Sequence, residues 1–539
     1  MARTMPNALA AIGALALSCG PGPAFAQDSD DARFGTVHFQ TSCSEVAQRR
    51  FDRAMRYEHS FWYAQAREIF EAALAADPGC AIAYWGVALS LLLNPHIATP
   101  KPNLAPGLAA LETARALGPK TQRERDYIDS LTLLYADYDK LTYQQRAQKY
   151  LHAMEAMAQR YPDDDEVQIA YALALSVTAP PHDKTYAYQL KGAALLEPIF
   201  KRQPRHPGVA HYLIHLYDYP PIAEKGLDAA ERYAEIAPAA PHALHMPSHI
   251  FTRVGHWKES IASNSASARA AKAGKEWQDE LHAMDYLVYA HLQLAQDAEA
   301  RAVVDEMLDT KQYNPNIRTG PYAIAASEAR YMVERRDWNG AAGLQVRPSK
   351  FAYVDAITHF ARALGEARTG ALERAKDDIA QLAALAERLR QEKDAYWAEQ
   401  VDIQGQIATA WLLDADGRYD QALATLGSAA DAEDKTEKSI VTPGPLAPAR
   451  ELYGEMLRER GHFVAALAQF EAVLSKEPNR FNALAGAAAS AEKAGDARKA
   501  SAYAQKLLAL AGDGAGSRPA VAAARRTLAN HPAEKDGGK

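Results

Sequence analysis

The 539-residue sequence has few cysteines, no excess of positive charge and no long apolar run after its N-terminal segment. The formal net charge of -7 leaves no basic surface for binding nucleic acid. No later segment is apolar over enough residues to cross a bilayer. A phosphate-binding glycine loop, a dinucleotide-binding glycine pattern and a nucleophile elbow are also missing, so no nucleotide-dependent or serine-nucleophile chemistry is indicated.

The first 26 residues have the features of a secretory signal peptide. Arg3 precedes a short apolar run, and Ala24 and Ala26 form a small-x-small cleavage site. The sequence therefore predicts cleavage after Ala26 and a periplasmic or secreted protein. Lipidation at Cys19 is the less favoured alternative, because Ala16 is an unusual residue three positions before a lipidated cysteine.

Removal of this segment leaves two of the 3 cysteines, Cys43 and Cys80. Paired thiols in an oxidising compartment usually form disulfides. A disulfide would tie the N-terminal arm to the second repeat. Two buried free thiols or a pair of soft metal ligands are the alternatives.

Several segments repeat the same residue offsets. Alanine, phenylalanine and proline recur together in two of them: Ala66, Phe70 and Pro78, and Ala466, Phe470 and Pro478. Gly461 and Gly495 lie 34 residues apart, each in a turn that leads into a helical pattern. This period and these residues resemble the tetratricopeptide repeat (TPR), a pair of antiparallel helices, from about Val37 to Ala511.

The TPR resemblance implies an all-α, right-handed α-solenoid of about nine to ten repeats with proline-rich insertions. Motifs such as "VHFQTSC" and "HMPSHIF" also resemble a group of exported bacterial TPR proteins, a likeness that implies fold and export but no activity. We expect an N-terminal solenoid over 27–345, a C-terminal solenoid over 346–511 and a mostly disordered tail over 512–539. The insertions, near residues 94–106, 178–185 and 217–226, would be a lid over the solenoid groove or ordinary loops.

Histidine is concentrated in one part of the sequence. Nine of the 17 histidines lie between His206 and His291. His211 and His245 are 34 residues apart, and so are His215 and His249, so the two pairs occupy equivalent places on neighbouring first helices of the repeats. In TPR proteins this helix lines the concave groove, where ligands bind.

The same alignment adds residues from two further positions to this groove. It places His242 beside the second pair, and His282, Asp285 and Tyr289 on the next first helix. A helix beginning at Pro247 is an alternative that would put His242 and His245 in a loop. His96 and His182 lie on insertions that could reach the groove, and His38 with His59 could form a second, smaller site.

Histidines at this spacing are suited to binding metal. Residues four apart on a helix have Cβ atoms about 5–6 Å apart, and neighbouring helices bring further ligands within reach. Imidazole ligands suit copper, zinc, iron or nickel. The predicted ligands, enough for two ions with three each, are His211, His215, His242, His245, His249 and His282.

Two classes of function remain open at this stage. One is a metal-dependent redox or hydrolytic enzyme for a small substrate, or a metal-handling protein, in which Asp285 orients an imidazole or acts as general base and Tyr289 hydrogen-bonds to the substrate. The other is a non-catalytic scaffold of the cell envelope that binds a protein or peptide in its groove. A metal-free polar pocket and ordinary packing between repeats are further interpretations of the histidines.

Overall fold

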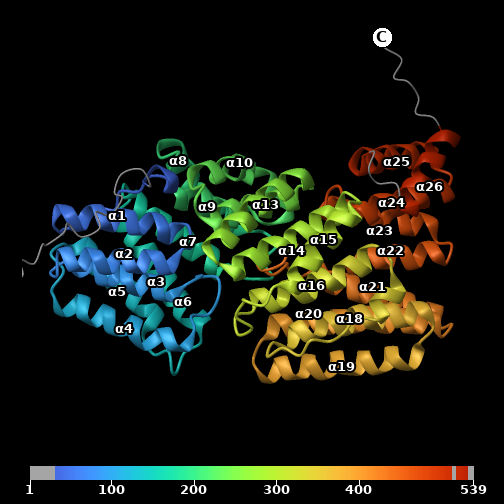
Figure 1. The fold of residues 1–539 in the computed structure, drawn as a ribbon, viewed down its shortest axis with the longest axis horizontal. Coiled ribbons are helices and arrows are strands. Elements are labelled where there is room, and N and C mark those ends of the chain that lie inside the picture. Colours follow the sequence, from blue (N-terminus) through green and yellow to red (C-terminus); the bar gives the residue numbers. More distant parts are fainter. Residues whose placement is uncertain (1–30, 513–517, 532–539) are drawn as a thin grey trace, which may run out of the picture.

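The computed structural model describes residues 31–512 and 518–531, and all regular structure in these ranges is helical (Figure 1). The predicted signal peptide, with Cys19 and Ala26, lies outside the described residues. The helices of the first half are η1 (Asp31–Phe34), α1 (Glu45–His59), α2 (Tyr63–Ala76), α3 (Ala81–Leu92), α4 (Lys101–Ala116), α5 (Gln122–Tyr135), α6 (Tyr143–Arg160), α7 (Asp165–Thr178), α8 (Ala187–Arg202), α9 (Pro207–Tyr217), η2 (Pro220–Gly226), α10 (Leu227–Ile236), α11 (Pro241–His245), α12 (Pro247–Arg253) and α13 (Trp257–Gly274).

The second half continues the same alternation of helices. Its members are α14 (Trp277–Gln293), α15 (Asp297–Asp309), α16 (Thr319–Glu334), α17 (Trp338–Ala342), α18 (Ala352–Thr369), α19 (Leu372–Gln391), α20 (Ala395–Ala415), α21 (Tyr419–Glu433), α22 (Ala449–Glu459), α23 (Phe463–Lys476), α24 (Phe481–Lys493), α25 (Ala497–Ala511) and α26 (Pro519–Asn530).

Each helix packs against its successor, and pairs stack on pairs, so the all-α, TPR-like solenoid predicted from the sequence is confirmed. With α11 and α12 counted as one broken helix, the described residues form twelve helix pairs followed by α26. This exceeds the nine to ten repeats expected, because pairs such as α3 and α4, which are separated by the loop 93–100, lack the regular 34-residue spacing.

The repeated residues have the local roles that their offsets predict. Gly461 and Gly495 adopt φ values of 81° and 83°, the left-handed conformation that glycine reaches without strain, and each closes the turn between two helices. Phe470 fits directly against the next helix. A Cβ added at Gly486 would lie 2.3 Å from its ring, so glycine is required at this crossing.

The last repeats fold back onto the middle of the chain, where α24 contacts α14 (Figure 1). Trp257 Nε1 donates to Asn479 O at 2.8 Å, and Arg480 Nη1 donates to the Tyr289 hydroxyl at 2.9 Å. One apolar cluster runs from Tyr322 to Met456, across the expected boundary at 345. The two expected solenoid segments therefore share a continuous core.

Two expectations about chain segments need correction. Pro519–Asn530 forms α26, which packs on α24 and α25 through Val521 and Ala524, so a mostly disordered tail over 512–539 is wrong for these residues. The first insertion is shorter than expected, because α4 already begins at Lys101, with a proline in its first turn.

Within residues 31–512 and 518–531, no helix combines the length and apolar content that crossing a membrane requires.

Cys43 and Cys80 form a disulfide, with Cα atoms 5.0 Å apart. The bond joins the segment before α1 to the start of α3, which supports the first of the alternatives left open by the sequence.

Replacing both cysteines with serine should lower the free energy of unfolding of the N-terminal repeats by about 3 kcal/mol, because the bond closes a loop of 37 residues. Urea denaturation followed by circular dichroism measures the change. The single Cys43→Ser variant should lose as much as the double variant. Two reactive thiols in the unfolded, unreduced protein would show that the bond does not form.

Candidate metal centre

The six predicted histidine ligands come together in the structure as two groups of three. The first triad is His211, His215 and His242, and the second triad is His245, His249 and His282. In each triad, one ring nitrogen per residue lies within 4.8 Å of the other two. Each triad thus joins a pair four residues apart to one histidine of the next helix or half-helix.

The two triads are neighbours. The ring centroids of His215 and His249 are 6.1 Å apart, and those of His242 and His245 are also 6.1 Å apart. All but His242 and His282, which are partly buried, are almost fully shielded from solvent. The arrangement brings six imidazoles into one buried region between α9 and α14.

In the first triad three Nε2 atoms converge. His211 Nε2 lies 3.1 Å from His215 Nε2 and 3.2 Å from His242 Nε2. His211 Nδ1 lies 2.7 Å from the backbone carbonyl of His59, which can only accept, so Nδ1 carries the proton and Nε2 presents a lone pair. A single lone pair cannot satisfy two neighbours at once, whereas a cation among the three nitrogens would contact all of them.

In the second triad, two unprotonated ring nitrogens are directed at each other. His245 Nδ1 lies 2.6 Å from Asn264 Oδ1, and His249 Nδ1 lies 2.9 Å from Asp218 Oδ2. Both partners are acceptors, because Asn264 Nδ2 is already directed to Ser260 O, so both Nδ1 atoms carry the protons. The two Nε2 lone pairs then face each other at 3.0 Å.

Protonation does not relieve this opposition of lone pairs. Burial lowers the pKa of His245 well below its usual value, and burial also lowers the pKa of His249 despite the hydrogen bond to Asp218. A metal ion does relieve it. Ligand distances of 2.0–2.1 Å in tetrahedral geometry place two nitrogens about 3.3 Å apart, close to the spacing in both triads.

Asp218 is held ionised by two buried cations. Arg253 Nε lies 2.7 Å from Oδ1, and Lys438 Nζ lies 2.8 Å from Oδ2. Although burial opposes ionisation, the charges of Lys438 and Arg253 hold the pKa of Asp218 well below its usual value. The carboxylate therefore remains an acceptor for His249 Nδ1–H, which fixes the orientation of that ring.

Pro247 begins α12, but His242 and His245 do not lie in a loop. They belong to α11, and Met246 between the two helices keeps helical angles, φ -53° and ψ -36°. Ser263 and Ser267 of α13 donate to Leu244 O and Pro241 O, in this proline-interrupted stretch. The break thus leaves the three histidines of this stretch in position for the two triads.

Asp285 and Tyr289 are placed away from the triads. Asp285 accepts from the Ser327 hydroxyl at 3.3 Å and lies 3.7 Å from Arg330 Nη2. Tyr289 accepts from Arg480 and donates to Glu477 at 3.3 Å. Neither forms a hydrogen bond with an imidazole among the described residues, so this geometry does not support the catalytic roles expected for them.

Other residues take the roles expected for Asp285 and Tyr289. Asn264 and Asp218 orient the imidazoles, and the Tyr286 ring packs 4.7 Å from His245 while its hydroxyl lies 3.4 Å from His249 Nε2. Asp218 directly follows the helix that carries the first histidine pair, a signal available in the sequence. Asn264 lies on the second helix of its repeat, whereas the predicted ligands all lie on first helices.

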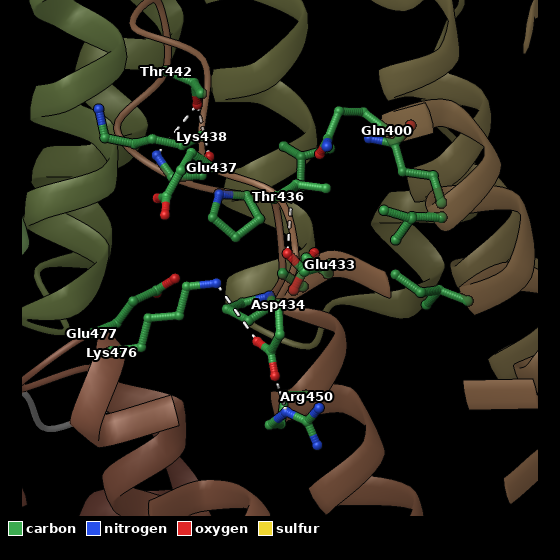
Figure 2. A pocket seen from close by; sticks show the side chains of 18 of the residues that line it. Gln400, Glu433, Asp434, Thr436, Glu437, Lys438, Thr442, Arg450, Lys476 and Glu477 are labelled. Atoms are coloured by element: carbon green, nitrogen blue, oxygen red, sulfur yellow. Dashed lines mark hydrogen bonds and ion pairs between the residues drawn. The ribbon is translucent and has the colours of Figure 1, made fainter. Parts of the chain in front are cut away.

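Residues 434–448, here called the covering segment, connect α21 to α22 and contact residues beside the second triad. Besides Lys438, the segment presents Thr442 O to the Tyr286 hydroxyl at 3.2 Å and Glu437 to Lys184 at 2.6 Å. Figure 2 shows Lys438 and Thr442 in the pocket that the segment lines, with Asp434 between Arg450 and Lys476. The covering segment thus contacts Asp218 and Tyr286, two residues that adjoin the second triad.

The remaining histidines differ in their surroundings. His96 is partly buried, and its ring centroid lies 4.6 Å from that of His215. Its buried Nε2 has no hydrogen-bond partner within the described ranges, whereas His182 is exposed. His38 binds Asp52, and so does not share a site with His59. His59 instead forms a third group with Glu166 and His206.

Hydrogen bonds explain much of the arrangement of these three side chains without a metal ion. His206 Nδ1 accepts from Val209 N, so Nε2 carries the proton and donates to Glu166 at 2.9 Å.

Comparisons with known proteins give no family. No protein-family model and no curated protein matches the chain. Among solved structures, the human IFIT1 dimer with m7Gppp-AAAA has 11% sequence identity, covers 80% of this chain and 90% of its own, and gives a TM-score of 0.32. Naa15/Naa10 bound to HypK-THB has 13% identity, covers 89% and 91%, and gives a TM-score of 0.22. Because these similarities are weak, a proposal about function has to rest on the site itself.

The tautomers of the oriented histidines can be tested directly. In metal-free protein at neutral pH, ¹⁵N shifts of the imidazole nitrogens should show the proton on Nδ1 and a free Nε2 for His211, His245 and His249, because each Nδ1 faces an acceptor. Signals are assigned by their loss in single His→Gln variants. A proton on Nε2 of His245 or His249 would remove the opposition of lone pairs.

Proposed function

We propose that the protein is an exported TPR-like solenoid that binds two transition-metal ions, one in each histidine triad. The observation that carries the proposal is the 3.0 Å contact between the unprotonated Nε2 atoms of His245 and His249, both fixed by acceptors at Nδ1. In a metal-free protein this contact is repulsive. A bound cation turns it into shared coordination.

The donor set favours a transition metal that imidazole binds well, such as copper, zinc or iron. Both triads offer only imidazole nitrogen, which these ions accept, whereas calcium and magnesium require oxygen ligands. Export is consistent with the Cys43–Cys80 disulfide, since such bonds persist in oxidising compartments. The N-terminal signal-like segment supports the same location.

Three protein ligands per ion favour catalysis over a purely structural role. Structural metal sites are usually closed by four protein ligands, while catalytic sites keep one position for water or substrate. Two such ions side by side would supply redox chemistry with copper or iron, or hydrolytic chemistry with zinc, on one small substrate. Asn264 and Asp218 hold the ligand rings in place, and the covering segment limits access of bulk water.

The competing role, a scaffold that binds an envelope protein or peptide in the groove, is less well supported at this site. The covering segment already forms the contacts there that a bound peptide would make, through Lys438, Thr442 and Glu437. Six buried imidazoles also have no evident use in peptide recognition.

Metal content tests the proposal. Protein purified from the periplasm without a histidine tag should contain two equivalents of transition metal by mass spectrometry. His211→Ala/His242→Ala and His245→Ala/His249→Ala should each lose one equivalent, because each pair belongs to a different triad. Loss of the metal should also lower the melting temperature of the wild type.

The matched control is His182→Ala/His462→Ala, which removes two exposed histidines and should keep both equivalents. Equal metal content in all four proteins, or no metal in the wild type even after reconstitution with copper, zinc and iron salts, would contradict the proposal.

A further inference from the structure

A second cavity lies beside the first triad and has a different chemistry. Its walls are largely aromatic, from Phe39, Phe61, Tyr63, Trp85, Tyr127, Tyr150 and Tyr212. Two carboxyl groups, Glu58 and Glu166, also line it, and no lysine or arginine does so among the described residues. The cavity thus combines aromatic surface with two carboxyl groups.

The two carboxyl groups differ in their partners. Glu166 is paired with His206 at 2.9 Å, and although burial opposes ionisation, His206 and His59 lower its pKa. Glu58 accepts a hydrogen bond from the Ser90 hydroxyl at 2.9 Å, and in the described part of the chain no lysine, arginine or histidine forms an ion pair with it. Burial raises its pKa to about 8. A buried carboxyl group without a counter-ion is costly, and a cation in the cavity would remove that cost.

Further polar groups in the walls lack partners. Among the described residues, the buried Tyr63 and Tyr127 hydroxyls have no hydrogen-bond partner, and Tyr127 is only 2% exposed. Hydroxyl oxygens accept hydrogen bonds from an ammonium group, and aromatic faces attract cations. A hydrated inorganic ion fits less well, since most of the wall residues are aromatic or aliphatic.

Two residues in the walls of this cavity, Phe61 and Leu93, have strained backbone angles. Phe61 has φ of 56°, an unusual value for an aromatic residue, and its ring lies 4.3 Å from His211 and 5.2 Å from His242 between ring centroids. Leu93 has φ 60° and ψ -146°, a region normally restricted to glycine. Strained residues of this kind concentrate at ligand-binding sites.

We infer that this cavity binds a small organic amine as its ammonium cation, with Glu58 as counter-ion and the aromatic walls around its apolar body. The ligand would lie next to the first triad, with Phe61 between them. No triad side chain lines the cavity, so the inference stands apart from the metal proposal.

Calorimetric titration of metal-free protein with benzylamine, and with benzyl alcohol as its neutral counterpart, tests the inference. Benzylamine should bind at least tenfold more tightly than benzyl alcohol. Glu58→Gln, which keeps the shape and the acceptor for Ser90, should weaken benzylamine binding at least tenfold and leave benzyl alcohol unchanged. Tyr127→Phe should weaken benzylamine binding to a smaller extent.

Two controls keep the test decisive. Tyr353→Phe, which removes another buried unpartnered hydroxyl far from this cavity, should bind benzylamine as the wild type does, and His245→Ala/His249→Ala should do so as well. Equal affinity for the two ligands, no binding of benzylamine by folded protein, or no effect of Glu58→Gln would overturn the inference. Each of these results would leave the metal proposal standing.

Discussion

The opposition of two imidazole lone pairs, those of His245 and His249, is the interaction on which the account of this protein depends. Asn264 and Asp218 hold the protons of these rings on Nδ1, so neither Nε2 atom has a proton to donate to the other. Their contact is favourable only if a cation lies between them. Asp218 in turn depends on Arg253 and on Lys438 of the covering segment. The geometry of the second triad therefore relies on contacts between parts of the chain about 220 residues apart.

The repeat architecture explains how so many imidazoles are buried together. Each first helix of a repeat presents residues four apart to the same face, and the next helix adds one more ligand at helix-packing distance. Buried polar groups are costly unless they are satisfied. Here backbone and side-chain acceptors satisfy the Nδ1 atoms of His211, His245 and His249, and the converging Nε2 atoms are left for an ion.

The sequence predicts the solenoid and the six clustered histidines well, because both follow from a local period of 34 residues. It does not predict how the six histidines are distributed between the two triads, since the break between α11 and α12 at Pro247 sets that distribution. It also misplaces the supporting residues on α14. Asp285 and Tyr286 are adjacent, and only packing against Arg330 or against His249 decides which of them reaches the triads. The covering segment, α26 and the return of α24 to α14 depend on contacts distant in sequence, which no periodicity reveals.

The most direct test of the central claim is an anomalous difference map from crystals of the protein soaked in a cobalt(II) salt. The account predicts two strong peaks, one among the ring nitrogens of the first triad and one among those of the second. A map with cobalt only at exposed surface histidines, and none among these six imidazoles, would contradict it.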